Sequence, residues 1–139
     1  MRCLTITFLI PTVESNELTI VAFNDENENG ILDIGERAIY DWEFHVEGPD
    51  EYVTVHHTDA FGRVSVEVEP DSDYTISENT IAGWRGTSPP IQCVTIREDN
   101  DVTVKFGFKR TSTVTIQVFE DINGDGEADV GDRSAGSNW

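Results

Sequence analysis

The chain has 139 residues and a formal net charge of -18, with 27 Asp and Glu against 9 Lys and Arg. This length suffices for one well-buried domain and part of a second. The charge excludes nucleic acid and anionic membrane surfaces as expected partners, because phosphates require clustered Lys and Arg. No run of about 18 apolar residues is present, so we expect no membrane insertion.

The first 16 residues are predicted to form an N-terminal strand, residues 3-10, and a linker, residues 11-16. The strand carries four alternating apolar residues on one face, namely Leu4, Ile6, Phe8 and Ile10. No small-residue cleavage site follows, so we do not interpret this stretch as a signal peptide. It is a candidate donor strand for another copy of the chain. The alternative is that it pairs with its own domain.

Residues 17-24 are predicted to form the first strand of a complete domain, and a twelve-residue calcium-loop motif follows at 25-36. The motif D-x-[DN]-x-[DN]-G-x5-E is matched at every defined position. The candidate ligands are the side chains of Asp25, Asn27, Asn29, Asp33 and Glu36 and the carbonyl of Ile31. All are hard oxygen donors, which Ca2+ prefers. We therefore predict an EF-hand-like loop that binds Ca2+ between the first two strands.

Apolar alternation predicts six further strands before residue 110. They are expected around residues 42-46, 51-58, 62-69, 74-76, 91-97 and 102-108. The strands 51-58 and 62-69 are expected to form a hairpin, and residues 79-90 a long loop. Seven strands at these spacings predict an all-β, Ig-like sandwich over residues 17-110.

Residues 111-139 are predicted to be a partial second repeat, with a strand at 112-119 and a second loop. Residues 114-133 align with 18-37 at an offset of 96, with nine of twenty positions identical. The second set of candidate metal ligands is Asp121, Asn123, Asp125, Glu127, Asp129 and Asp132. Asp replaces Glu at the last position. Because a strand and a loop cannot bury an apolar face alone, either further sequence or another chain is expected to complete this unit.

Other residue types are less informative. Cys3 and Cys93 are a candidate disulfide, within one chain or between copies, if the protein is extracellular. His56 and His57 are neighbours on a predicted strand, so their side chains point to opposite faces and do not chelate one metal together. Trp84, between glycine and arginine in a predicted loop, is a candidate sugar-binding residue. No catalytic spacing stands out, and we expect no enzymatic activity.

The chain resembles a known family in three places: residues 20-37, Trp42 to Val46, and the turn Thr58-Asp-Ala-Phe-Gly-Arg63. These stretches are similar to the B-type repeat of serine-aspartate-repeat (Sdr) surface adhesins, within the Cna-B and prealbumin-like sandwich group. The resemblance implies a rigid calcium-binding spacer at a cell surface, with Asp59 as a further candidate ligand. Related Cna-B domains often carry a Lys-Asn isopeptide bond, but the first strand here has no Lys, so we expect none.

These features predict a calcium-binding structural subunit of an extracellular surface protein, adhesin stalk or filament. We expect its partners to be copies of itself, joined head to tail by strand complementation, or neighbouring repeats. The alternative is a carbohydrate- or protein-binding β-sandwich module of a larger secreted protein, with a glycan or another surface ligand as its partner.

Overall fold

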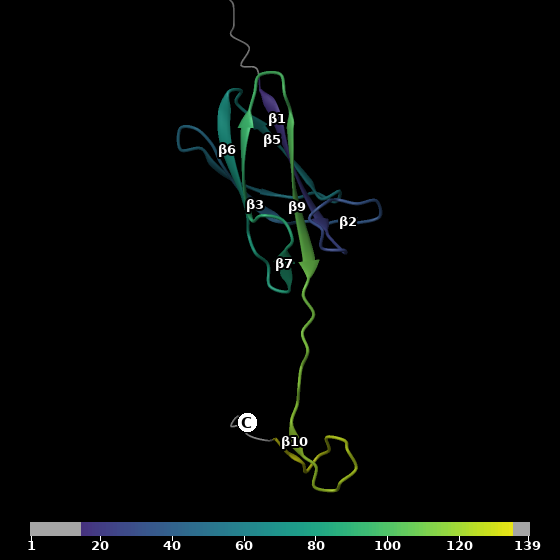
Figure 1. Cartoon of the computed structure of the whole chain (residues 1–139). Helices are drawn as coiled ribbons and strands as arrows, with labels where there is room; N and C mark the ends of the chain where they lie inside the picture. Colours follow the sequence, from purple (N-terminus) through teal and green to yellow (C-terminus); the bar gives the residue numbers. More distant parts are fainter. Residues whose placement is uncertain (1–14, 135–139) are drawn as a thin grey trace, which may run out of the picture.

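The computed structural model describes residues 15–134, in which all regular structure is β-strand (Figure 1). The strands are β1 (Asn16–Asn24), β2 (Arg37–Ala38), β3 (Glu43–Glu47), β4 (Val53–His57), β5 (Arg63–Val68), β6 (Ser72–Glu78), β7 (Trp84–Gly86), β8 (Ile91–Ile96), β9 (Val102–Arg110), β10 (Phe119–Glu120) and β11 (Arg133–Ser134). Among these residues no helix is long and apolar enough to cross a membrane. The predicted strand 3-10 and Cys3 lie outside the described residues.

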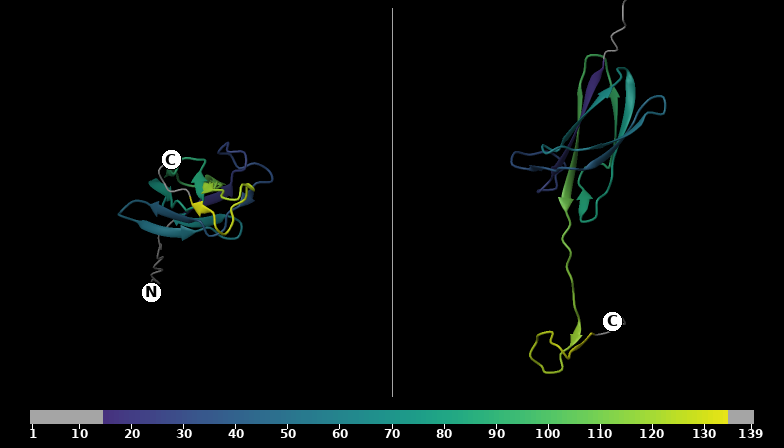
Figure 2. Two further views of the ribbon diagram at one scale, coloured as in Figure 1. Left: turned by 90° about the horizontal axis from the view of Figure 1, so that it is seen from below. Right: turned by 180° about the vertical axis from the view of Figure 1, so that it is seen from behind.

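The first nine strands form two sheets that pack face to face (Figure 2). One sheet has the order β2-β1-β9-β7, with β5 also paired to β1, and the other has the order β4-β3-β6-β8. β1 and β9 are parallel, with Leu18 opposite Val102, whereas the other pairs are antiparallel. The predicted all-β sandwich is therefore confirmed.

The core lies between the sheets and follows the predicted alternation. Leu18, Ile20 and Ala22 of β1 have no exposed surface. Trp42 stacks on Phe108 of β9, with ring centroids 3.8 Å apart, and is 1% exposed. Trp42 is therefore a core residue.

The predicted hairpin between residues 51-58 and 62-69 is wrong. β4 pairs with β3 and β5 pairs with β1, so the turn between β4 and β5 carries the chain from one sheet to the other. Gly62 in this turn has a φ of +69°, and a Cβ there would lie 2.5 Å from the Ala22 carbonyl oxygen. The turn therefore requires glycine for both its backbone conformation and its close approach to β1.

Two short strands of the sandwich were not predicted. β2 pairs with the end of β1, directly after the first loop, and β7 lies inside residues 79-90, which were predicted to be a loop. Both strands have two or three residues, too few for an alternating pattern to be recognised. They lengthen the sheet at the end that carries the first loop.

The predicted strand at 112-119 is also wrong for most of its length. Residues 111–118 have no ladder partner within the described part of the chain, and only Phe119–Glu120 is paired. The apolar residues on one face of this segment, Val114, Ile116 and Val118, are 81%, 82% and 53% exposed. Figure 2 shows the segment leaving the end of β9 and running away from the sandwich.

Candidate metal-binding loops

The first loop, residues 25-36, joins β1 to β2 and is closed by its last residue. The Glu36 carboxylate accepts a hydrogen bond from Glu26 N at 3.0 Å and another from Asp33 N at 3.0 Å. Asp25, the first residue, accepts from Asn29 N at 3.1 Å and from Gly30 N at 2.7 Å. The two terminal acidic residues thus hold the backbone of the loop in a closed ring.

Three predicted ligands meet inside this ring. The side-chain amides of Asn27 and Asn29 donate to the same oxygen, Asp33 Oδ2, at 2.8 and 2.7 Å. These residues occupy positions 3, 5 and 9 of the motif, whose side chains face the ion in an EF-hand. Rotation of each amide by half a turn would replace its nitrogen with an oxygen. The side chains are therefore placed to share one small cation.

The donor set fits a hard divalent cation, although its carboxylates are not gathered around one point. Within residues 15–134, no three His, Cys, Asp or Glu side chains lie close enough together to hold a metal by themselves. The converging groups in the first loop are two amides and one carboxylate. Oxygens of this kind suit Ca2+ and do not suit soft metals. Asp25, Asn27, Asn29, Asp33, Glu36 and the Ile31 carbonyl would hold the ion.

The first loop is attached to the sandwich by backbone and ionic contacts. Asp25 N donates to the Phe108 carbonyl of β9 at 2.8 Å, and Lys109 Nζ donates to the Glu26 carbonyl at 2.6 Å. Arg85 of β7 pairs with Glu28. A change that orders the loop should therefore also stabilise the positions of β9 and β7.

Asp25 has no exposed surface, and its carboxylate accepts hydrogen bonds from two amides of the loop, Asn29 N and Gly30 N. Burial tends to raise its pKa, yet the nearby Thr87 hydroxyl, the Gly30 and Asn29 amides and the Lys109 charge together hold the pKa below its ordinary value. Asp25 is therefore ionised at neutral pH, as a metal ligand must be.

The second loop, residues 121-132, repeats most of this hydrogen-bond network, but at position 5 Asp125 accepts a hydrogen bond where Asn29 donates one. Asp121 accepts from Asp125 N and Gly126 N, and Asn123 Nδ2 donates to Asp125 Oδ2 and Asp129 Oδ2 at 3.1 and 2.9 Å. A hydrogen bond from the Glu127 amide lowers the pKa of Asp125. Positions 3, 5 and 9 again meet.

The shorter last residue of the second loop does not change how the loop closes. Asp132 accepts from Ile122 N at 3.2 Å and from Asp129 N at 2.7 Å, as Glu36 does from the matching amides. The flanking strands also keep the register: Phe119 pairs with Ser134 as Phe23 pairs with Ala38. The second loop differs in its setting, because no sandwich strand lies against it in the described residues.

The remaining candidate residues do not join either loop. Asp59 Oδ1 accepts from Phe61 N and Arg63 N at 2.8 and 3.0 Å, so its carboxylate stabilises the turn between the sheets. Cys93 lies exposed on β8. Its predicted pairing with Cys3 involves a residue outside the described ones and remains a prediction.

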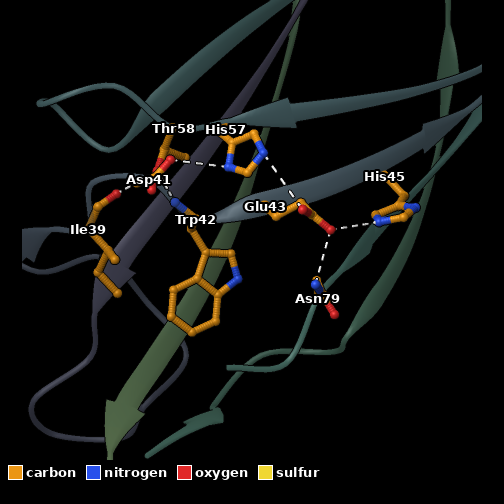
Figure 3. Close-up of polar contacts among 8 residues, drawn as sticks. All are labelled: Ile39, Asp41, Trp42, Glu43, His45, His57, Thr58 and Asn79. Carbon is orange, nitrogen blue, oxygen red and sulfur yellow. Dashed lines mark hydrogen bonds and ion pairs between the residues drawn. The ribbon is translucent and has the colours of Figure 1, made fainter. Parts of the chain in front are cut away.

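His45 and His57 belong to a polar cluster on the outer face of the β3 sheet (Figure 3). Glu43 accepts from Asn79 and lies 3.0 Å from His45 Nε2, and His57 lies between Glu43 and Asp41. The hydrogen bond with His45 lowers the pKa of Glu43. His56 faces the other side of β4, as predicted from its position beside His57.

The Trp84 ring is less accessible to a sugar ligand than its position in a predicted loop suggested. The Arg110 guanidinium lies over its ring at 4.9 Å from the centroid, and Trp42 packs edge-on at 5.6 Å. An open pocket of about 590 Å³ lies beside it, with Arg37, Tyr40 and Arg110 among the lining residues. Trp84 therefore serves mainly as a wall of this pocket rather than as an exposed ring.

Sequence reasoning missed Arg85 and Lys109, which fasten the first loop to the sandwich, and Thr87, whose hydroxyl lies near Asp25. Each lies at least 49 residues from Glu36, and each comes near the loop only because β9 runs parallel to β1 and pairs with β7. Local pattern carries no signal for that arrangement. Lys109 had one clue: it is one of only two lysines in the chain.

Comparison with family models and with curated proteins gave no match. Solved structures with a similar fold include the minor pilin GBS52 of Streptococcus agalactiae, at 18% identity and a TM-score of 0.53, over 73% of this chain and 47% of that one. The shaft pilin SpaA of Lactobacillus rhamnosus GG matches at 12% identity and a TM-score of 0.52, over 71% and 51%. Its N-terminal domain matches at 14% and 0.50, over 74% and 99%.

This chain thus spans about half the length of the two longer pilins. At these identities the likeness shows the fold alone. It supports the all-β sandwich predicted from the sequence, whereas membership of the Cna-B and prealbumin-like group and the likeness to the Sdr B-type repeat remain predictions.

Proposed function

We propose that this chain is a calcium-binding, non-enzymatic structural subunit of an extracellular surface filament or adhesin stalk. The observation that carries the proposal is the pair of loops, 96 residues apart, in which side chains at positions 3, 5 and 9 converge. Both loops are closed by their last residue in the same way, and both are flanked by strands rather than by helices. This favours a structural role over that of a calcium sensor, whose helices reorient when the ion binds.

Bound Ca2+ would supply positive charge between carboxylates that otherwise repel one another. Asp25 and Glu36 would fix the two ends of the first loop, and the Asn27, Asn29 and Asp33 oxygens would face the ion. Because the loop contacts β9 and β7, binding would stabilise the whole sandwich by linkage. A stiff sandwich suits a spacer at a cell surface, where calcium is abundant.

Assembly is the second part of the proposal. The exposed apolar face of residues 114-118 needs a covering strand, and addition of a strand from another copy satisfies backbone groups as well as apolar surface. Head-to-tail addition of this kind gives an open filament. The pilin structures of similar fold are proteins of surface filaments by their names, which supports an extracellular location. Residues 3-10 are the donor strand expected from the sequence.

The test compares purified chain in excess Ca2+ and in chelator by sedimentation and electron microscopy. We expect sedimenting filaments with Ca2+ and smaller species in chelator. A calcium-bound protein that stays monomeric at high concentration would contradict assembly, and absence of calcium binding by titration calorimetry would contradict the metal site. The two halves of the proposal are therefore tested separately.

The alternative, a module that binds a glycan or another surface ligand, is favoured by one observation. The pocket beside Trp84 contains two arginines, although the chain as a whole is strongly acidic. A ligand bearing a carboxylate would suit it, because a stacked guanidinium keeps its in-plane N–H donors free. A glycan array with Arg110→Gln as the matched variant tests this alternative; no acidic glycan bound by the parent chain would contradict it.

A further inference from the structure

Strand β4 is an unprotected sheet edge. It pairs with β3 on one side only within the described residues, and Val53 and Val55 on its outer face are 61% and 49% exposed. Its sequence Val-Thr-Val-His-His contains no Lys, Arg, Asp or Glu, although 26% of the chain is charged. Natural edge strands are usually protected by charges, prolines or covering segments. Within residues 15–134, β4 has none of these.

Two other edge strands have features that β4 lacks. β5, which borders the facing sheet, carries Arg63 and Glu67 on its exposed face. β8, at the opposite end of the β4 sheet, is tied to the facing sheet by Gln92, whose side chain donates to the Lys105 carbonyl at 2.9 Å. β8 also contains no Lys, Arg, Asp or Glu, so what distinguishes β4 is that, in the described residues, none of its side chains bonds to the facing sheet.

A second uncharged strand-like segment lies in the same chain. Residues 111–118, Thr-Ser-Thr-Val-Thr-Ile-Gln-Val, contain no charge and no proline, and most of them are β-branched. Such segments pair readily with free strand edges. As described above, Val114, Ile116 and Val118 are exposed and the backbone has no ladder partner in the described part of the chain.

The segment does not reach β4 of its own chain. It follows β9 directly, and Thr111 N is held by the Gly83 carbonyl at 2.8 Å. Residues 111-113 span at most about 10 Å, which is only the usual distance between packed sheets. β4 lies at the far edge of the facing sheet, and Figure 2 shows the segment running away from the sandwich. A β4 edge that pairs with this segment must therefore belong to another copy.

We propose that residues 112–118 of one copy add as a strand to the free edge of β4 in a second copy. Val114, Ile116 and Val118 then lie on the same face as Val53 and Val55, and both backbones gain hydrogen bonds. The contact joins two different surfaces, so repetition produces an open chain of copies. This inference rests on the proposed filament function, but it assigns residues 112–118 as the added strand and β4 as the acceptor edge, in place of residues 3-10 as the donor.

Cysteine cross-linking tests the contact in a Cys3→Ser/Cys93→Ser background. One chain carries Val55→Cys and the other carries a single cysteine at each position from 114 to 118. We expect disulfide-linked heterodimers with cysteine at 114, 116 or 118, and none at 115 or 117, because side chains alternate along a strand. Cross-linking that ignores this alternation, or is absent while the parent chain assembles, overturns the inference.

The competing occupant is tested in parallel. A chain carrying Ile6→Cys is mixed with one carrying Ile116→Cys; capture of this pair in place of the Val55 pair would show that residues 3-10 cover the segment, and would overturn the inference.

Sedimentation of the intact chain in Ca2+ supplies a second readout. Val55→Lys and Ile116→Lys are each expected to abolish most of the sedimenting fraction, because each places a charge in the proposed contact. Ile91→Lys is the matched control: Ile91 is 59% exposed on β8 of the same sheet, at the other edge. Equal loss in all three variants overturns the inference. Cross-linked dimers without filaments would support the β4 contact and contradict the filament function. Filaments without alternating cross-links would support the filament function and contradict the β4 contact.

Discussion

Calcium binding at the first loop should stabilise the sandwich, whereas binding at the second should not. At free Ca2+ about 100 times Kd, a single site adds about 2.7 kcal/mol to the free energy of unfolding. For a domain of this size each 1 kcal/mol shifts Tm by about 4–8 °C, so the expected rise is roughly 10–20 °C. The double variant Asp25→Asn/Glu36→Gln should lose nearly all of it.

The matched variant is Asp121→Asn/Asp132→Asn, which makes the same chemical change at the end positions of the second loop. Because that loop contacts no sandwich strand in the described residues, the sandwich should keep its calcium-dependent Tm while the number of bound ions falls by one. Thermal unfolding by circular dichroism, in Ca2+ and in chelator, with titration calorimetry for stoichiometry, gives both readouts. Equal loss of the Tm shift in both variants would refute the coupling through β9.

Three further predictions concern the sandwich itself. Thr58→Val should lower the free energy of unfolding by about 2–4 kcal/mol in urea denaturation, because the Thr58 hydroxyl, 2% exposed, serves two buried backbone groups, Trp42 N and the Ile39 carbonyl; an unchanged midpoint would contradict this. Burial raises the pKa of Glu78, against the opposing effect of the nearby Trp42 indole. The protonated form of Glu78 is therefore favoured in the folded state, and its contribution to stability is present below the unfolded pKa and lost as pH rises through the folded pKa. Glu78→Gln, which is always neutral, should be more stable than the parent at pH 7 but not at pH 4. Burial lowers the pKa of His56 below 6.5, so unfolding is favoured as pH falls below about 6.5, and His56→Gln should reduce that pH dependence.

The sequence predicted the parts of the fold that depend on local pattern. The alternation of Leu18, Ile20 and Ala22 gave the inward face of β1, and the same reasoning gave the buried residues of β9. Pairing was harder, because period-2 alternation assigns a face but not a neighbour. The hairpin expected between β4 and β5 failed for this reason: a short turn joins strands of one sheet or of two, and Gly62 alone does not distinguish them.

In the loops, too, the contacts between residues close in sequence were predictable, whereas the contacts with distant strands were not. Their ligands and closing hydrogen bonds follow from the order of Asp, Asn, Gly and Glu within twelve residues, since each side chain bonds an amide a few positions away. The fastening contacts of Arg85 and Lys109 depend on sheet order and were not predictable. A calcium site could thus be located from the sequence, but its effect on the sandwich could not.

Comparison of the two loops distinguishes the hydrogen bonds that the motif forms by itself from the contacts that the sandwich adds to it. It reproduces the closing network, with Asp132 in place of Glu36, without β9 or β7 beside it. The ring of hydrogen bonds is therefore a property of the twelve residues, and the sandwich contributes only the coupling. It follows that calcium at the second loop can stabilise a fold only after another strand system packs against residues 114-120. If copies assemble through β4, this second site should gain a thermal effect in filaments that it lacks in monomers.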